Sequence, residues 1–430
     1  MFKNEAHVSR KIDLDSGMAT SLEALKSSAS SGGLTAACLS TSSELAAFSG
    51  EWRELYQRIG CQTPFLSVEW MSTWWRHWGG KGQLFIVTVR QASGRLVAIA
   101  PFYVRRSIIG PLGPRGLCFL AHKWVGSDHL NILVDPEHEQ PAIQAIIGFV
   151  EQRRAVWDYI ELADGEEASP VFARLCEGFQ LLGMTHRITH AETCPYTALP
   201  SSFETFLAGV GSNLRYNFRR RRRALEREGE FKFTVLRSHD ELQEHFGELV
   251  RLHRLRFEHQ HKYTSFLTPH IQTFHADALK HMAANGMARL FLLQVGGEVV
   301  GALYGFSVGK TFSFYQTGID PAWQRLSVGL VMMGCSIEEA IRTGHERFDF
   351  LRGDEGYKFQ WTQDSRRAGT HYFFDRRLRS QCAWPEVWAM RYLKRLVLRS
   401  IAMVRGVLPQ GKLDQLINVA NVKINRQSSD

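Results

Sequence analysis

Residues 290–308 read LFLLQVGGEVVGALYGFSV, two apolar runs joined by a pair of glycines. This is the pattern of a β-hairpin, because glycine readily adopts the positive φ angles that a two-residue turn requires. Residues 84–103 read LFIVTVRQASGRLVAIAPFY and show the same pattern, with serine and glycine at the turn. The chain therefore carries two hairpins of one design.

The segments after the two hairpins also repeat, in the order strand, helix, short buried strand. We expect these elements at 130–134, 140–153 and 157–160 in the first half, and at 311–317, 327–344 and 348–351 in the second. Landmarks that recur in one order indicate an internal duplication. Two unrelated α/β domains with a similar rhythm are the alternative.

This order predicts an α/β fold of two domains, each a mixed and mostly antiparallel sheet flanked by helices. A doubly wound nucleotide fold is not expected, because no G-x-G-x-x-G follows an early strand. We expect a disordered tail, a first domain, a second domain and a basic C-terminal tail at residues 1–32, 33–199, 200–380 and 381–430.

The composition of the 430 residues is that of a globular protein, with 44% hydrophobic and 22% charged residues. The seven cysteines are scattered without a C-x-x-C pair, which argues against a disulfide framework or a zinc site. Neither a signal peptide nor a long apolar run is visible, so we expect a cytoplasmic protein. The net charge of +9 favours anionic partners.

Two stretches of the second half have the composition of a ligand site. Residues 320–329 read DPAWQRLSVG and lead from a strand into a helix, whose N-terminal N–H groups favour anions. An ordinary helix start capped by Ser327 is the alternative. Residues 348–358 read FDFLRGDEGYK, where an apolar strand is followed by ionisable side chains that can donate or accept protons. A salt-bridged turn is the alternative there.

Four segments together resemble the CelD-like acetyltransferases, a branch of the GNAT superfamily often linked to bacterial cellulose and exopolysaccharide production. They are LRYNFRRRRRALEREG at 214–229, ELVRLHRLRFEHQ at 248–260, SVGLVMMGCSIEEAIRTGHER at 327–347 and FDFLRGDEGYKFQW at 348–361. The resemblance extends over roughly residues 34–380. It implies tandem duplicated GNAT-like domains, with an acyl-CoA site in the second.

The resemblance implies acetyl-CoA or another acyl-CoA as co-substrate and no metal. It places the pyrophosphate on Gln324, Arg325, Ser327, Val328 and Gly329. In the superfamily pattern Q/R-x-x-G-x-G/A, Ser327 stands where the first glycine is expected. The loop of this chain therefore departs from the pattern at one position.

The resemblance also implies catalytic roles. Tyr357 would protonate the departing thiolate of CoA, and Glu355 or Asp354 would accept a proton from the attacking amine. Residues expected to contact the acceptor are His253, Arg256, Arg352 and Lys358. For His253 and Arg256, which share one helix face, a solvated or salt-bridged face is an equal alternative.

The first half lacks a matching loop. After the strand near residue 134 it reads DPEHEQP, which is acidic and without glycine, and would repel a pyrophosphate. We therefore expect the first domain to bind no cofactor and to shape the acceptor cleft instead.

Two basic segments allow more than one interpretation. The arginine-rich helix near 215–227 suits a phosphate or a solvated surface better than nucleic acid, which is the alternative. Residues 384–408 have an apolar stripe and a basic face, as in a helix that lies on an anionic membrane. Packing on the preceding domain is the alternative for that segment.

The sequence thus predicts an acyl-CoA-dependent N-acyltransferase that acts on an amine of a small molecule or saccharide precursor. One alternative is a ligase like the Fem family, which shares the tandem plan and takes an aminoacyl group from tRNA. Another is a non-catalytic partner in polysaccharide assembly, since fold alone does not guarantee activity.

Overall fold

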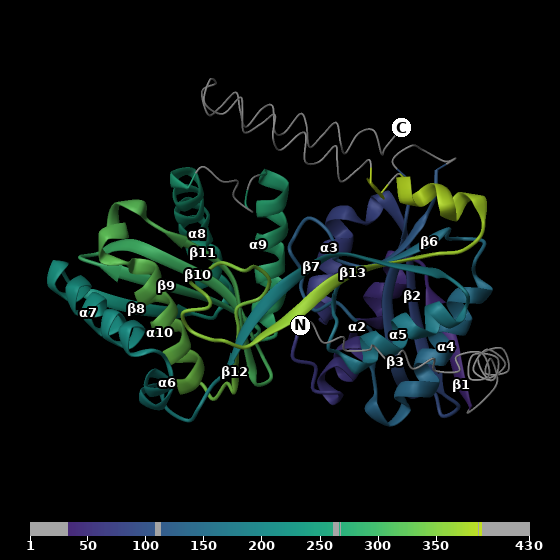
Figure 1. Ribbon diagram of the computed structural model, residues 1–430, viewed down its shortest axis with the longest axis horizontal. Helices are drawn as coiled ribbons and strands as arrows, with labels where there is room; N and C mark the ends of the chain where they lie inside the picture. The colour runs from purple at the N-terminus through teal and green to yellow at the C-terminus, as the bar shows by residue number, and fades with distance from the viewer. Residues whose placement is uncertain (1–32, 108–112, 261–265, 267, 386, 389–430) are drawn as a thin grey trace, which may run out of the picture.

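The computed structural model describes residues 33–107, 113–260, 266, 268–385 and 387–388. Two lobes lie side by side, and two long strands run from one lobe toward the other (Figure 1). The expected tail at 1–32 and most of the expected C-terminal helix at 384–408 lie outside the described residues.

The first lobe is a sheet with helices on its faces. Its strands are β1 (Leu34–Leu39), β2 (Gly82–Gln91), β3 (Leu96–Arg105), β4 (Gly116–Phe119), β5 (Leu133–Val134) and β6 (Tyr159–Glu166). Its helices are α2 (Ser42–Arg58), α3 (Val68–Trp78), α4 (Glu139–Gln152) and α5 (Pro170–Leu181).

The second lobe has the same two kinds of layer. Its strands are β8 (Phe231–Leu236), β9 (Ala288–Val295), β10 (Glu298–Val308), β11 (Thr311–Ile319) and β12 (Arg347–Asp349). Its helices are α6 (Phe203–Gly209), α7 (Ser212–Glu228), α8 (His239–His259), α9 (Pro269–Ala284) and α10 (Val328–Arg342), with the 3-10 helix η4 (Pro321–Leu326) before α10.

The repeated plan and the predicted fold class are confirmed. β2 and β3 pair antiparallel, as do β9 and β10, and each hairpin is followed by a parallel strand pair. In the first lobe this pair is β4 with β6, and in the second it is β11 with β12. Helix α4 precedes β6, and α10 precedes β12.

One predicted strand differs from the structure. Of the strand expected at 130–134 only Leu133–Val134 forms, and it pairs with β3 rather than with β6. The parallel neighbour of β6 is β4, which the sequence analysis did not predict. The strand is short because the side chain of Asn131 bonds the adjacent backbone: its Oδ1 accepts from the N–H of Ile132 at 2.8 Å.

The two lobes share strands. β7 (Thr185–Ala198) pairs first with β13 (Ser365–Phe374), then through its last residues with β12. β13, late in the chain, also pairs with β6 in the first lobe. One continuous sheet results, in the order β1-β2-β3-β4-β6-β13-β7-β12-β11-β10-β9-β8. The predicted boundary at residue 199 stays a prediction; β7 ends just before it, and β13, from beyond it, pairs with a strand of the first lobe.

Aromatic side chains fill the space where the lobes meet. Trp70 of α3 lies edge-on to Phe274 of α9, with ring centroids 5.1 Å apart, and to Tyr315 of β11 at 5.7 Å. Trp70 and Trp74 are fully buried, so the tryptophan-rich helix α3 belongs to the core. Among the described residues, no helix has the length and apolar content to span a membrane.

Candidate active site

The parallel strands of the second lobe part where β12 ends. β11 and β12 pair over three residues only, from Thr311 with Arg347 to Ser313 with Asp349. β11 then continues to Ile319, while the chain after Asp349 turns away into the loop that contains Tyr357. The end of β11 thus stands between this loop on one side and the start of α10 on the other.

The turn from η4 into α10 has an unusual backbone. Ser327 lies in the left-handed region, with φ 55° and ψ 46°, where the backbone of residues other than glycine is strained. Its side chain makes no capping hydrogen bond, so the first N–H groups of α10 have no side-chain cap. An uncapped helix N-terminus suits an anion. Ser327 therefore keeps the conformation that a glycine would have there.

Gly329 packs against the end of the strand. A Cβ atom at this position would lie 2.7 Å from Cδ1 of Ile319. The lack of a side chain therefore lets the first turn of α10 approach β11. Val328 is fully buried beside it, so it can offer a ligand only its backbone.

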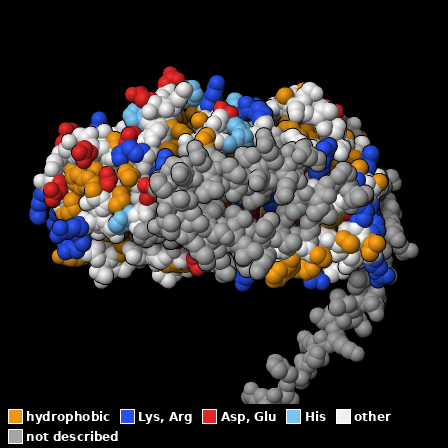
Figure 2. Space-filling model, turned by 90° about the horizontal axis from the view of Figure 1, so that it is seen from above, with side chains coloured by type: hydrophobic (Ala, Val, Ile, Leu, Met, Phe, Trp, Pro, Cys, Tyr) orange, Lys and Arg blue, Asp and Glu red, His pale blue; other side chains and the backbone are white. Residues whose placement is uncertain are grey.

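The other two loop residues predicted to bind the cofactor are exposed. Gln324 Oε1 lies 3.0 Å from Nε2 of His259, in the last turn of α8. The carbonyl oxygen of Arg325 accepts a hydrogen bond from Nη1 of Arg221 in α7 at 2.7 Å. The arginine-rich helix thus reaches the loop at the start of α10, at one end of the molecule (Figure 1), where Figure 2 shows basic side chains among acidic and apolar ones.

Helix α8 joins the loop to Tyr357. Nη1 of Arg256 donates to the carbonyl oxygen of Thr317 on β11 at 3.2 Å. The same guanidinium lies over the ring of Tyr357, 5.7 Å from its centroid. Burial raises the pKa of Tyr357 to about 12, although the charge of Arg256 acts to lower it. The phenol is therefore protonated at neutral pH.

His253, one turn before Arg256, is a core residue. It is fully buried, stacks on Phe257 at 4.4 Å, and its Nε2 lies 3.0 Å from Oε1 of Gln316. Burial lowers the pKa of His253 to about 4, so the ring is neutral. Its position places it beneath β11 rather than on an open surface.

The predicted proton acceptors and Lys358 form one compact turn. Nζ of the buried Lys358 donates to the carbonyl oxygen of Arg352 at 2.6 Å and pairs with Glu355 at 2.9 Å. Half of the Glu355 side chain is exposed, and Asp354 is exposed. Lys358 therefore holds the loop together, while the two carboxylates face solvent.

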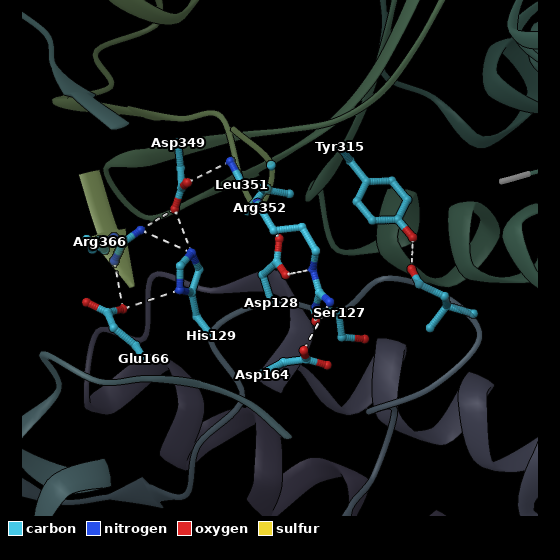
Figure 3. A network of polar contacts seen from close by, with 12 residues as sticks. Ser127, Asp128, His129, Asp164, Glu166, Tyr315, Asp349, Leu351, Arg352 and Arg366 are labelled. Atoms are coloured by element: carbon cyan, nitrogen blue, oxygen red, sulfur yellow. Dashed lines mark hydrogen bonds and ion pairs between the residues drawn. The ribbon is translucent and has the colours of Figure 1, made fainter. Parts of the chain in front are cut away.

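Arg352 is bound to the first lobe (Figure 3). Its backbone N–H donates to Asp128 at 2.9 Å, and its guanidinium bonds Asp128 and the carbonyl oxygen of Ser127 and pairs with Asp164 at 3.0 Å. The two carboxylates raise the pKa of Arg352 above its usual range, against the effect of burial. These partners could not be predicted from the sequence, since they lie more than 180 positions earlier in the chain.

A second polar network adjoins the first (Figure 3). Arg366 of β13 bonds Asp349 and donates to Glu166 at 2.8 Å. His129 lies between the two acids, with Nε2 3.2 Å from Asp349 and Nδ1 3.4 Å from Glu166. His129 has φ 54°, a strained backbone of the kind found at functional sites. No sequence motif indicated this group.

Cys118, His122 and Glu161 offer ligand atoms within 4.8 Å of one another, in the buried part of the first lobe. Arg105 and Lys123 lie 3.2 Å and 3.4 Å from Glu161. Burial raises the pKa of Cys118 to about 12 and lowers that of His122 to about 3. The two cations already supply the positive charge that a metal ion would bring.

Comparison with known proteins assigns the second lobe. Residues 212–359 match the family model of the acetyltransferase (GNAT) domain. The second half contains a GNAT domain. The match covers less than half of the chain and includes the η4–α10 turn, α8 and the loop of Tyr357. No curated protein matches the sequence.

Three solved structures are similar to this chain, to different degrees. The crystal structure of FemX superposes with a TM-score of 0.55 at 12% identity, over 79% of this chain and 96% of that chain. The C-terminal domain of a putative lysylphosphatidylglycerol synthetase from Agrobacterium fabrum gives 0.49 at 11% identity, over 79% and 96%. A tandem GNAT protein from the clavulanic acid biosynthesis pathway gives 0.43 at 11%, over 79% and 98%. At such identity FemX shows a common fold alone.

Proposed function

We propose that the chain is an acyl-CoA-dependent N-acyltransferase whose reaction takes place at the end of β11. One observation carries the proposal: the last turns of α8 contact both functional loops. Arg256 lies on the ring of Tyr357, and His259, three residues on, lies 3.0 Å from Gln324 in the phosphate loop. Residues three apart share one helix face. A general acid and an anion-binding helix start therefore meet at one strand end.

The reaction needs no covalent enzyme intermediate. The acceptor amine attacks the thioester carbonyl, the C–N bond forms and the C–S bond breaks, and the thiolate takes a proton from the Tyr357 hydroxyl. The pKa of about 12 keeps this proton in place until the thiolate develops. The guanidinium of Arg256 then stabilises the phenolate.

The amine must lose a proton as it attacks. Glu355 and Asp354 are the carboxylates closest in sequence to Tyr357, and both reach solvent, so either passes the proton outward directly or through water. Gln324, Arg325, Ser327, Val328 and Gly329 would hold the CoA pyrophosphate. Arg352 and Lys358 fix the loop that carries Tyr357, and so position it.

We infer an amine of a small molecule or saccharide precursor as the acceptor. The resemblance to CelD-like acetyltransferases supports a role in exopolysaccharide or cellulose production. The first lobe contributes Ser127 and Asp128 beside the catalytic loop, which supports its role in shaping the acceptor side.

Thiol release from acetyl-CoA with a panel of amines and amino sugars tests this function. Tyr357→Phe should lower kcat about 100-fold, the usual contribution of a general acid, with little change in the KM for acetyl-CoA. Asp364→Asn, outside the site, should keep full activity. Absence of amine-dependent thiol release by the wild-type chain would contradict the proposal and favour a non-catalytic role.

A Fem-like aminoacyl-tRNA-dependent ligase is the second candidate. The common fold with FemX supports it, and so does the surface of α7, where Arg223 and Arg227 are without an acidic partner among the described residues. A gel shift with aminoacyl-tRNA distinguishes the two. Tight, salt-sensitive tRNA binding without acetyl-CoA turnover would select the ligase.

A further inference from the structure

A cavity of about 240 Å³ lies between the two lobes, apart from the proposed acyl-transfer site. It is lined by Thr311 and Ser313 at the start of β11, whereas the phosphate loop follows its end. Six residues separate Ser313 from Ile319, about 20 Å along an extended strand. The cavity is therefore a second candidate site.

The wall of the cavity is mainly apolar, with polar side chains set among residues such as Leu66, Ile132 and Val171. A carboxylate–guanidinium group lines the cavity. Residues with hydroxyl and amide groups from both lobes line it as well: Gln62, Thr63, Asn131, Ser169, Thr311 and Ser313. Two buried atoms of lining residues have no partner within the described chain, Thr63 Oγ1 and Arg366 Nε, whereas His129 Nδ1 lies 3.4 Å from Glu166. Buried polar atoms normally have partners, so these indicate a bound polar molecule.

The charges differ between the interior and the mouth. In the interior, Asp349 and Glu166 share the guanidinium of Arg366 and the ring of His129, which lies 3.2 Å from Asp349 and 3.4 Å from Glu166. Glu166 Oε2 accepts from Arg366, while its Oε1 has no partner among the described residues. This carboxylate oxygen can accept a hydrogen bond from an ammonium group.

At the mouth the charge is positive. Arg347 is exposed, lines the cavity and has no acidic partner in the described part of the chain. Its guanidinium lies 5.2 Å from the ring centroid of Tyr196, and Arg366 lies at the same distance from that ring. Stacking on an aromatic ring holds a guanidinium in place for a carboxylate or phosphate.

We propose that this cavity binds a hydroxylated amine of monosaccharide size that carries one anionic group, the chemistry of an amino-sugar phosphate. The ammonium lies at Glu166, the hydroxyls meet the amide and hydroxyl wall, and the anion meets Arg347. The volume lies just below the ~300–1,000 Å³ of drug-sized pockets, which suits one sugar ring.

The occupant contacts the support of the catalytic loop. Asp349 Oδ1 accepts from the N–H of Leu351 at 2.9 Å, and Leu351 has a strained φ of 55°. The carbonyl oxygen of Leu351 in turn lies 3.4 Å from Nζ of Lys358, next to Tyr357. A ligand that engages this acidic group therefore orders the loop that bears Tyr357.

Calorimetry on the full chain tests the site with four probes: glucosamine 6-phosphate, glucose 6-phosphate, glucosamine and inorganic phosphate. Glucosamine 6-phosphate should bind at least 10-fold more tightly than each of the others, because it alone has both charges and the ring. Arg347→Gln should weaken glucosamine 6-phosphate about 10-fold and leave glucosamine unchanged. Lys310→Gln, a neighbouring exposed cation outside the lining, should change neither.

A cavity-filling variant, Val171→Phe, should abolish binding while thermal unfolding shows an intact fold. Saturable binding that survives both Arg347→Gln and Val171→Phe would place the probe elsewhere and overturn the proposal. Lack of saturable glucosamine 6-phosphate binding by the wild-type chain would overturn it too. Because binding is read without acyl transfer, this result is independent of the function proposed for Tyr357.

Discussion

At the scale of single residues, Ser327 shows how a departure from a motif is accommodated. From sequence it is a missing glycine in the phosphate loop. In the structure it has φ 55°, and so the turn keeps the shape that glycine favours at the cost of strain. A motif specifies residue types, whereas the loop requires a conformation, and that conformation could not be predicted from the sequence.

Ser327→Gly should therefore stabilise the protein. Relief of the left-handed strain, about 1–2 kcal/mol, exceeds the entropy cost of glycine, about 0.5–1 kcal/mol. The free energy of unfolding in urea should rise by about 0.5 kcal/mol or more, and acetyl-CoA affinity should not fall. Ser327→Val should have the opposite effect on stability. A loss of stability in Ser327→Gly would mean that the serine side chain holds the turn.

His253 predicts a pH dependence. Burial lowers its pKa from 6.5 to about 4. Between these two pH values the unfolded state therefore binds a proton that the folded state does not bind. The stability contributed by the neutral ring is full above pH 6.5 and is lost as pH falls toward 4, by up to about 3 kcal/mol.

Unfolding of the wild type and His253→Gln, measured between pH 7 and pH 4, checks this. The difference in unfolding free energy between the two should shrink or reverse as pH falls, since glutamine does not titrate. A constant difference across the range would show that His253 is not protonated on unfolding.

At the scale of elements, the close approach of α8 to β11 positions Arg256 and His259. A Cβ atom on Gly318 would lie 2.4 Å from the backbone nitrogen of His253. Only glycine permits this approach, which the sequence did not indicate, because Gly318 has no neighbouring motif.

Gly318→Ala should force the helix away from the strand, destabilise the protein by about 1–3 kcal/mol and lower acyl transfer. Gly247→Ala, in the exposed face of the same helix where a Cβ meets nothing within 4 Å, should stabilise it by up to about 1 kcal/mol. Denaturant unfolding compares the two. Equal effects of both changes would argue against the close approach.

Elements with a strong local pattern could be predicted from sequence, and those defined by distant partners could not. The hairpins and α10 were expected because periodicity and glycine turns are local signals. β4 was missed because it is only four residues long, and one of its two partners, β6, lies beyond a helix. Arg352 was expected to contact the acceptor, whereas in the structure it binds Asp128. This partner is too distant in sequence to be inferred.

At the scale of the whole molecule, the position of β13 in the sheet makes the two lobes interdependent. β13 lies between β6 and β7, so the first lobe obtains an internal strand from the end of the chain. A duplication read from sequence suggests two separable units, and pairing between residues so far apart leaves no local signal.

Residues 33–199 produced alone should therefore fail to unfold cooperatively, since β6 and β7 lose their shared partner and expose backbone groups. Co-production with residues 200–388 should restore a cooperative transition, seen by near-ultraviolet circular dichroism during heating. Cooperative folding of the first fragment by itself would show that β13 is dispensable to that lobe.

The central claim, that the second lobe binds acyl-CoA at the end of β11, is tested most directly by titrating acetyl-CoA into the full chain in a calorimeter. We predict one saturable site per chain, weakened at least 10-fold by Gly329→Trp, which blocks the first turn of α10, and unchanged by Gly247→Ala. No heat of binding from the wild type, or equal affinity in Gly329→Trp, would contradict it.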